Sequence, residues 1–254
     1  MTGGASTQGK GVFLVTGGSR GIGAATALLA ARHLYPVAIF YRDREDQAAI
    51  VLGAIKAAGG QAIAVRADVA DEHALMSGFE AVDRFGTLQV LVNNAGITGG
   101  MSRLEDLSAA AIEHVCRVNI VGAFLSARAA IRRLSTLHGG RGGSIINVSS
   151  GAAVHGTPNT WIHYAATKGA IDTMTVGLSK EVALEGIRVN AVRPGVIGTE
   201  IHEHRSDEQM STLKKAIPMG RFGTADEVAE AIVWLASPAA SYVTGALLDV
   251  RGGY

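Results

Sequence analysis

The sequence predicts an α/β domain in which helices cover both faces of a mostly parallel sheet. Short apolar segments alternate with longer helical ones along the whole chain, as in successive βαβ units. Hydrophobic residues make up 48% of the 254 residues, and charged residues make up 18%. Glycine occurs 33 times, which suits the turns of a sheet that is buried on both faces.

Four strands are predicted in the first half of the chain, each a short run rich in Val, Ile, Leu or Phe. They cover residues 12–16, 37–41, 61–66 and 88–92. Helices follow to about residue 34, over 44–58, over 71–85 and, in a longer region, over about 105–137. Gly59 and Gly60 end the second helix, and Asp71 is placed as the N-cap of the third. The long region is expected to be interrupted near Asn119.

Three more strands are predicted in the second half of the chain. They cover residues 144–148, 187–192 and 247–250. One helix runs to about residue 185, and another over 226–236 is capped by Thr224. Since no linker interrupts the alternation, we predict a single domain over residues 11–254, preceded by a short flexible tail over 1–10.

Composition disfavours several classes of function. A formal net charge of +1 gives no electrostatic reason to expect nucleic acid or an anionic membrane as a partner. No apolar run long enough to span a bilayer stands out, and the first residues lack the apolar segment of a signal peptide. The single cysteine, Cys116, fits a reducing cytosol, and the eight histidines show no metal-ligand spacing. We therefore expect a cytoplasmic protein that binds a small molecule and no metal.

The stretch Y-A-A-T-K over residues 164–168 is a candidate acid–base group. Tyr164 and Lys168 are four residues apart, so on a helix they lie one turn apart on the same face. A phenol ionises at a pH of about 10, and a neighbouring ammonium favours the phenolate. Lys168 is therefore expected to lower the pKa of Tyr164. Ser150, fourteen residues upstream of Tyr164, is placed to hold a substrate oxygen against the phenol.

The glycine-rich sequence T-G-G-S-R-G-I-G over residues 16–23 is a second candidate site. It lies between a predicted strand and a predicted helix, which is the context of a phosphate-binding turn. Gly17 permits the tight turn, while Gly21 and Gly23 let the backbone approach a pyrophosphate. The start of the helix supplies N–H groups and the positive end of the helix dipole. We predict a dinucleotide site at this first strand–helix turn.

The end of the second strand, F-Y-R-D over residues 40–43, bears on the choice of dinucleotide. NAD sites commonly place Asp or Glu there to bind the ribose 2′-hydroxyl, but Tyr41 occupies that position here. Arg42 follows it, and together with Arg20 of the glycine turn it suits a 2′-phosphate, which guanidinium groups bind in a bidentate, charge-assisted way. NADP(H) is therefore favoured. NAD(H) stays open, because Asp43 serves a ribose hydroxyl if the register differs by two.

Five motifs occur in order: the glycine turn, N-N-A-G over 93–96, Ser150, the Y-x-x-x-K pair and P-G at 194–195. With these motifs the sequence resembles the short-chain dehydrogenase/reductase family over nearly its whole length. It is similar to the branch that holds 3-oxoacyl-carrier-protein reductases and bacterial glucose 1-dehydrogenases. The resemblance implies one Rossmann-type, doubly wound domain with a seven-stranded parallel sheet. It also implies an oxidoreductase that interconverts a carbonyl and a secondary alcohol by hydride transfer, usually as a homotetramer.

The resemblance places the family's catalytic tetrad on Asn119, Ser150, Tyr164 and Lys168. Tyr164 is then the acid–base group, and Ser150 binds the reacting oxygen. Lys168 orients the nicotinamide ribose and connects through Asn119 to solvent. The interval from Ser150 to Tyr164 is one residue longer than is usual in the family, and the loop over residues 155–160 is expected to absorb it. Strand alternation is expected to point the neighbouring serine, at position 149, to the opposite face.

The same resemblance assigns the cofactor site. Asp68 and Val69 lie at the adenine, and residues 94–96 line its ribose and the strand end. The P-G segment flanks the nicotinamide, and Thr199 reaches the phosphates. The full set of predicted cofactor-binding residues is Gly17, Ser19, Arg20, Gly21, Ile22, Gly23, Tyr41, Arg42, Asp68, Val69, Asn94, Ala95, Gly96, Tyr164, Lys168, Pro194, Gly195, Ile197 and Thr199.

The substrate is a ketone, an aldose or a 3-oxoacyl group, and the residues do not rank these three. Residues 196–218 are polar and irregular with one short helix, and they are expected to form a substrate loop. His155 and His163 are interpreted as loop or rim residues near the site. Two alternatives stay open: an NAD(H)-dependent dehydrogenase of the same family, and a non-catalytic dinucleotide-binding regulator. The presence of all four tetrad residues disfavours the regulator.

Overall fold

The structure is a computed structural model that describes residues 9–198 and 207–254. Within these residues, seven strands form one parallel sheet in the order β3-β2-β1-β4-β5-β6-β7. They are β1 (Val12–Thr16), β2 (Val37–Tyr41), β3 (Ala62–Arg66), β4 (Leu88–Asn93), β5 (Gly143–Val148), β6 (Ile187–Pro194) and β7 (Leu247–Val250). The predicted doubly wound parallel sheet is confirmed, and the bounds of its strands differ from the expected ones by no more than about two residues, as is usual for element ends.

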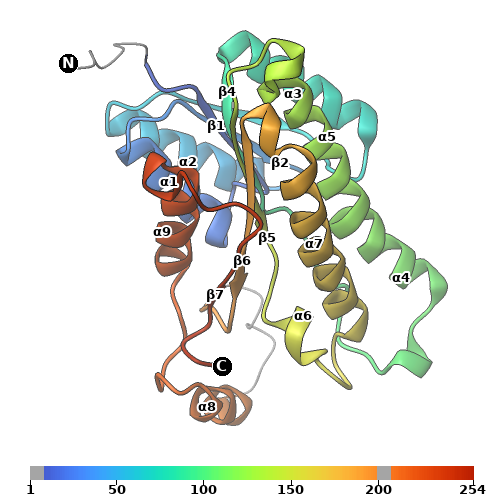
Figure 1. The fold of residues 1–254 in the computed structure, drawn as a ribbon. Helices are drawn as coiled ribbons and strands as arrows, with labels where there is room; N and C mark the ends of the chain where they lie inside the picture. The colour runs from blue at the N-terminus through green and yellow to red at the C-terminus, as the bar shows by residue number, and fades with distance from the viewer. Residues whose placement is uncertain (1–8, 199–206) are drawn as a thin grey trace.

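Helices cover both faces of the sheet, as Figure 1 shows. One face carries α1 (Gly21–Arg32), α2 (Glu45–Ala57) and α9 (Ala225–Ala236). The other carries α3 (Glu72–Phe85), α5 (Gly122–Leu134) and α7 (Ile162–Glu181). Two shorter helices, α6 (Ala152–His155) and α8 (Asp207–Ala216), lie beyond the carboxyl ends of the strands. Short 3₁₀ turns cover Leu104–Asp106, Thr136–His138, Ala183–Glu185 and Pro238–Ala240.

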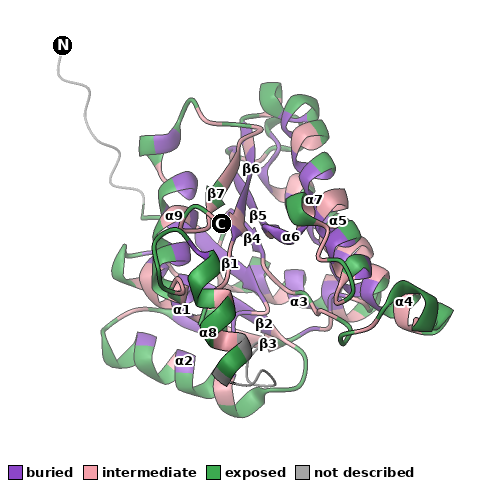
Figure 2. Cartoon of the chain, turned by 90° about the horizontal axis from the view of Figure 1, so that it is seen from below, coloured by how far each residue is buried: buried purple, intermediate pink, exposed green. Residues whose placement is uncertain are grey.

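The hydrophobic core has two parts on opposite sides of the sheet, because side chains alternate along each strand. Phe13 and Val15 of β1 pack toward α1, α2 and α9, whereas Val12 and Leu14 pack toward α3 and α5. Every residue of β1 is buried. Figure 2 shows buried strands in purple between helices whose outer faces are green. A strand that is buried on both faces has a continuous apolar sequence, which is why β1 is recognisable without alternation.

Local signals set the ends of several helices. The side chain of Asp71 accepts a hydrogen bond from the backbone N–H of Ala74 at 3.1 Å, as expected of the N-cap of α3. Thr224 and Glu227 form a capping box at the start of α9. After α2, Gly59 adopts a φ of 79°, which glycine reaches without steric cost. The helices therefore begin and end close to the residues that the sequence indicates.

The long helical region consists of α4 (Ala109–Cys116), a π-helical turn (Arg117–Val121) and α5. The interruption predicted near Asn119 is confirmed as this π turn. Among the described residues, the run Ala109–Leu134 is long and apolar enough, by length and composition alone, to cross a membrane, which differs from the sequence expectation. However, α5 contacts β4 and β5 and buries Ala130 and Leu134 against the sheet, which is the position of a core helix.

Candidate active site

The glycine turn and the N-N-A-G segment lie side by side where the strand order reverses. β1 and β4 are neighbours in the sheet although they are not consecutive in the chain. Helix α1 leaves β1 over one face, while the chain after β4 continues to α5 on the other. Open parallel sheets bind ligands at the carboxyl ends of the strands at such a switch point. The fold thus brings the two predicted cofactor segments together.

The glycine turn itself has the geometry of a phosphate cradle. Gly17 adopts a φ of 64°, and Gly21 adopts a φ of 54°. A Cβ atom at Gly23 would overlap the carbonyl oxygen of Gly17, so only glycine fits there. The N-cap residue of α1, Arg20, makes no side-chain capping hydrogen bond, and the first turn of α1 carries no acidic residue. The N–H groups at this helix start are thus not satisfied by a side-chain cap, so they suit an anionic group.

Asn94 fixes the turn to the end of β4. Its side-chain amide donates hydrogen bonds to the carbonyl oxygens of Thr16, at 2.9 Å, and Gly17, at 3.0 Å. The hydroxyl of Thr16 accepts hydrogen bonds from the backbone N–H groups of Asn94 and Ala95, at 3.0 and 3.1 Å. The amide of Asn94 therefore positions the glycine turn. The predicted place of residues 94–96 along a ribose stays a prediction.

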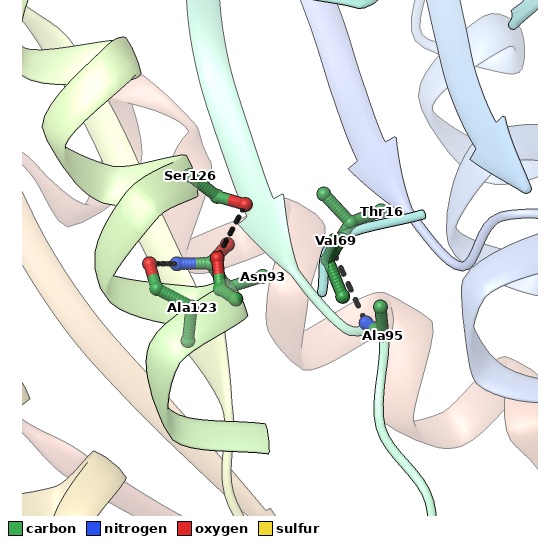
Figure 3. A pocket seen from close by; sticks show the side chains of 7 residues that line it. Thr16, Val69, Asn93, Ala95, Ala123 and Ser126 are labelled. Carbon is green, nitrogen blue, oxygen red and sulfur yellow. Dashed lines mark hydrogen bonds between the residues drawn. The ribbon is translucent and has the colours of Figure 1, made fainter. Parts of the chain in front are cut away.

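Next to this turn, a small cavity lies between the ends of β1 and β4 and helix α5 (Figure 3). Its lining is Thr16, Val69, Asn93, Ala95, Gly122, Ala123 and Ser126. The polar groups there are already paired, because Asn93 donates to Ala123 O at 3.2 Å and Ser126 donates to Gly122 O at 2.8 Å. None of the predicted tetrad lines the cavity. It is a packing space behind the cofactor segments and not the catalytic centre.

The turn after β3 holds Asp68 and Val69. Asp68 accepts a hydrogen bond from the backbone N–H of Ala70 at 2.9 Å, which closes the turn. Val69 is buried, and its side chain would collide with a Cβ atom at Gly122. Val69 lines the same small cavity as Asn93 and Ala95, so the turn lies beside the N-N-A-G segment. The contact of this pair with an adenine stays a prediction.

Ser150 and Tyr164 meet through a side-chain hydrogen bond at the end of β5. Ser150 also accepts a hydrogen bond from the backbone N–H of Ala152 at 3.1 Å. The hydroxyl of Ser149 instead donates to the carbonyl oxygen of Lys168, at 3.2 Å. The two serines have different partners, and it is Ser150 that reaches the phenol, as predicted.

Lys168 lies below the phenol in the interior of the protein. It is 5% exposed, and its Nζ lies 5.6 Å from the centre of the Tyr164 ring. Nζ donates a hydrogen bond to the carbonyl oxygen of Val148 at 2.8 Å. Burial lowers the pKa of Lys168 to about 8, and the charge of Asp172 acts in the opposite direction. At neutral pH the side chain is therefore still mainly an ammonium.

The pKa of Tyr164 differs from the sequence expectation. Burial raises this pKa above its usual value, and the hydrogen bond with Ser150, the smaller of the two effects, lowers it. Removal of the phenolate from water outweighs the expected effect of the Lys168 charge, whose Nζ is directed to Val148 O. The expectation of a lowered pKa was wrong for the protein without ligand. In this state Tyr164 is a neutral phenol, the form that donates a proton.

Asn119 lies in the π turn and is 2% exposed. Its amide oxygen accepts a hydrogen bond from Ile97 N–H at 2.9 Å, and its amide nitrogen donates to Ile97 O at 2.9 Å and to the hydroxyl of Thr167 at 3.0 Å. A Cβ atom at Gly96 would lie 3.2 Å from Asn119 Oδ1 and 3.5 Å from Lys168 Nζ. Asn119, Gly96 and Lys168 thus converge at one point behind the phenol.

The P-G segment, residues 194–195, lies at the end of β6 next to the segment that follows Ser150. Gly151, which follows the catalytic candidate serine, donates a backbone hydrogen bond to Pro194 O at 2.8 Å. Gly195 packs on Arg251, because a Cβ atom there would lie 2.8 Å from the Arg251 Cα. The side chain of Ile197 is buried in the hydrophobic core, so the predicted contact of this residue with the cofactor falls to its backbone. The predicted residue Thr199 lies outside the described residues.

At the end of β2, Tyr41 pairs in register with Arg66 of β3. The Nε of Arg42 forms an ion pair with Asp43 at 2.5 Å, and both side chains are about half exposed. Arg66 donates a hydrogen bond to the Arg42 carbonyl oxygen at 3.1 Å. Arginine side chains therefore gather at the strand end where a dinucleotide ribose lies in this type of sheet.

Two features near the site were missed or misread from the sequence. The segment after Ser150 forms a helical turn, α6, which the sequence did not indicate, and in the following loop Thr157 and Asn159 adopt positive φ angles of 41° and 62°. His163, interpreted as a rim residue, is 6% exposed and packs inward from α7 against Gly99. That interpretation was wrong, because His163 shares the helix face of Thr167, which contacts Asn119.

Among the residues that the structure describes, no group of three His, Cys, Asp or Glu side chains is placed to hold a metal ion. The chemistry available at the site is therefore a neutral phenol, a hydroxyl, a buried ammonium and an amide. Residues 94–96 join these groups to the glycine turn, since Gly96 lies against Asn119 and Lys168, and Asn94 and Ala95 lie against Gly17.

Comparisons with known proteins show which family this chain is similar to. Residues 17–254 match the model of a protein family described as "Enoyl-(Acyl carrier protein) reductase". The chain is 49% identical over 244 residues to the uncharacterized oxidoreductase YgfF of Escherichia coli (strain K12), covering 95% of this chain and 99% of that protein. A short-chain dehydrogenase from Burkholderia cenocepacia, solved in complex with NADP, is 35% identical with a TM-score of 0.89, over 97% of this chain and 98% of that one. A 3-ketoacyl-(acyl-carrier-protein) reductase from Brucella melitensis, complexed with NADH, is also 35% identical with a TM-score of 0.89, over 98% of this chain and 99% of that one.

Proposed function

This chain belongs to the short-chain dehydrogenase/reductase family of oxidoreductases, and from that premise we propose that it interconverts a carbonyl and a secondary alcohol with NADP(H), using Tyr164 as the acid–base group. The observation that carries the proposal is the meeting of Ser150, Tyr164 and Lys168 beside the glycine turn. A hydroxyl next to a neutral phenol is what a carbonyl oxygen needs when it accepts negative charge and then a proton.

Each member of the tetrad has a separate task in the reductive direction. Ser150 holds the substrate oxygen by a hydrogen bond, and Tyr164 donates its proton to that oxygen. The ammonium of Lys168 stabilises the phenolate that remains. Asn119 holds the 96–97 segment against Lys168, so that the proton path behind the phenol keeps its shape.

A nicotinamide dinucleotide, when bound, supplies or accepts the hydride. The fit is supported by the start of α1, which has no side-chain cap and suits the pyrophosphate, and by Gly17 and Gly23, where a Cβ atom would crowd the turn. At Gly96 a Cβ atom would instead crowd Asn119 and Lys168. Asp68 and Val69 lie at the adenine end, and the backbone of Pro194 and Gly195 lies at the nicotinamide end. Relatives bind NADP in one case and NADH in another. The arginines at the end of β2 favour NADP(H) for this chain.

The first prediction concerns this preference. Arg42→Ala is expected to lower kcat/KM with NADPH about 10- to 100-fold, since it removes charge-assisted hydrogen bonds to a 2′-phosphate, while kcat/KM with NADH stays unchanged. Arg44→Ala is the matched control, because Arg44 lies two residues away and pairs with Asp46 at 3.2 Å. Equal losses with both dinucleotides in the Arg42 variant would point to a general binding role and against NADP(H) selection.

For the substrate we propose a ketone, an aldose or a 3-oxoacyl group. A panel of these three classes, run in parallel with NADPH and NADH, tests both the substrate class and the reaction. A protein that binds the dinucleotide but turns over no member of the panel would favour the alternative, a non-catalytic regulator.

The second prediction is a homotetramer. Ala166, Gly169 and Ala170 lie on a partly exposed face of α7, and a Cβ atom at Gly169 would meet nothing within 4 Å. Such small residues let another helix approach closely. Light scattering at micromolar concentration is expected to give four times the mass of the chain, and a uniform monomer would contradict the proposal.

A further inference from the structure

A buried acidic side chain lies one helical turn beyond Lys168. Asp172 of α7 is 8% exposed, and its Oδ2 accepts a hydrogen bond from Arg193 Nε at 3.0 Å. The same oxygen forms an ion pair with Arg193 Nη2 at 2.9 Å. Its other oxygen, Oδ1, is buried with no hydrogen-bond partner among the described residues. Burial of a charged group is costly unless other charges compensate it, so this carboxylate needs more than a packing explanation.

The partner of Asp172 belongs to the other wall of the site. Arg193 is the residue before Pro194 at the end of β6, and it lies opposite Asp249 of β7 in the sheet register. Arg193 and Asp249 approach to 3.9 Å, and Asp249 binds Arg251 at 2.6 Å. Arg251 in turn packs on Gly151 and Gly195, where added Cβ atoms would lie 2.9 and 2.8 Å from it. A row of alternating negative and positive side chains therefore connects α7 with Gly151 and Gly195.

We propose that Asp172 is a positioning residue of this active site: its carboxylate supplies the negative charge that faces the Lys168 ammonium, and through Arg193 it fixes α7 to the strand end that carries Pro194 and Gly195. The role of Lys168 in catalysis rests on the function proposed above. The charge interaction between Asp172 and Lys168 and the ion pair between Asp172 and Arg193 are independent of that function.

Of the side chains and backbone groups near Lys168, Asp172 is the one that carries a negative charge toward it. Tyr164 on the same helix is a neutral phenol, and β5 contributes the Val148 carbonyl oxygen. The π turn contributes the uncharged amide of Asn119, and β6 contributes the cation of Arg193. Asp249 of β7 lies beyond Arg193 and is paired with Arg251. Among the described residues that pack around Lys168, Asp172 is thus the acidic side chain that opposes its burial.

The third prediction follows from the sign of this interaction. Burial lowers the pKa of Lys168 and Asp172 raises it, with a net value of about 8. In Asp172→Asn the raising charge is lost, so the midpoint of the Lys168 titration is expected to fall by about one pH unit. The midpoint is measured by NMR of protein with ¹³C-labelled lysine, in the absence of dinucleotide, with the Lys168 signal identified by its loss in Lys168→Arg.

Arg193→Lys is the matched control, since it changes the geometry of the ion pair but keeps both charges. Its Lys168 midpoint is expected to match that of the wild type, although its stability to urea falls. An unchanged midpoint in Asp172→Asn, or an equal fall in Arg193→Lys, would overturn the proposal in favour of a purely structural ion pair. If the single variant does not fold, Asp172→Asn with Arg193→Gln leaves no unpaired buried charge, and its midpoint is judged in the same way.

Turnover then separates this inference from the proposed function. In the reductive direction, the loss of kcat with rising pH is expected to begin at lower pH in Asp172→Asn than in the wild type, because Lys168 is neutral sooner. If the NMR midpoint moves as expected but the wild type shows no turnover with any substrate, the positioning charge stands and the proposed function fails.

Discussion

Replacing Tyr164 with Phe is expected to reduce turnover about 10²- to 10⁴-fold, which is the usual contribution of a positioned proton donor. The variant removes one oxygen atom from a ring that lies beside Ser150 and above Lys168, so the shape of the site is kept. The dissociation constant for NADPH, measured by fluorescence titration, is expected to change little, because the glycine turn and the end of β2 are untouched. Turnover is followed as NADPH oxidation with the best substrate of the panel.

Tyr242→Phe provides the control for this experiment. Tyr242 is fully exposed, so loss of its hydroxyl is expected to leave turnover unchanged. Near-normal activity of the Tyr164 variant would show that Tyr164 is not the acid–base group. Loss of both turnover and NADPH binding would instead indicate that the substitution disturbs the whole site.

Replacing Gly23 with Ala is expected to weaken NADPH binding about 10- to 100-fold, the equivalent of one or two charge-assisted hydrogen bonds to phosphate. The added Cβ atom would overlap Gly17 O and lie 2.5 Å from Asn94 Nδ2, and neither atom is the mobile end of a flexible chain. The turn must move, which also costs about 1–3 kcal/mol of stability. Fluorescence titration and urea unfolding measure the two effects.

Gly53→Ala makes the same chemical change where there is room for it. Gly53 lies within α2, and a Cβ atom there would meet nothing within 4 Å. Its stability is expected to rise by up to about 1 kcal/mol, because alanine is the better helix former, and its NADPH affinity is expected to match the wild type. A Gly23 variant with wild-type affinity would show that the turn does not contact the dinucleotide.

Strong local signals explain why most of the fold was predictable. The buried strands are continuous apolar runs, and Asp71 and Thr224 are helix caps whose hydrogen bonds are formed as expected. Tyr164 and Lys168 share a helix, so their spacing alone placed them together. Ser150 was placed with them as a candidate from the start, whereas Asn119 comes from another helical segment and was added by the family resemblance.

Long-range effects explain what the sequence did not show. The raised pKa of Tyr164 comes from removal of the phenol from water in the folded protein, which no spacing between two residues reveals. The pairing of Asp172 with Arg193 joins α7 to β6 across 21 residues, so it required the sheet to be in place. His163 looked like a loop residue because the sequence before it is rich in turn formers, yet it begins α7 facing inward.

The π turn at Asn119 makes the site sensitive to residue count rather than to residue type. A π turn holds one residue more than the α-helical turn it replaces, and adding or removing a residue rotates everything after it by about 100°. A chain one residue shorter between Cys116 and Gly122 would form a more regular helix. In that shorter chain the side-chain amide of Asn119 would point away from Ile97 and Thr167, or α5 would turn its apolar face away from the sheet. A deletion here would therefore improve local helix formation and at the same time disturb either the Asn119 contacts or the packing of α5 on the sheet.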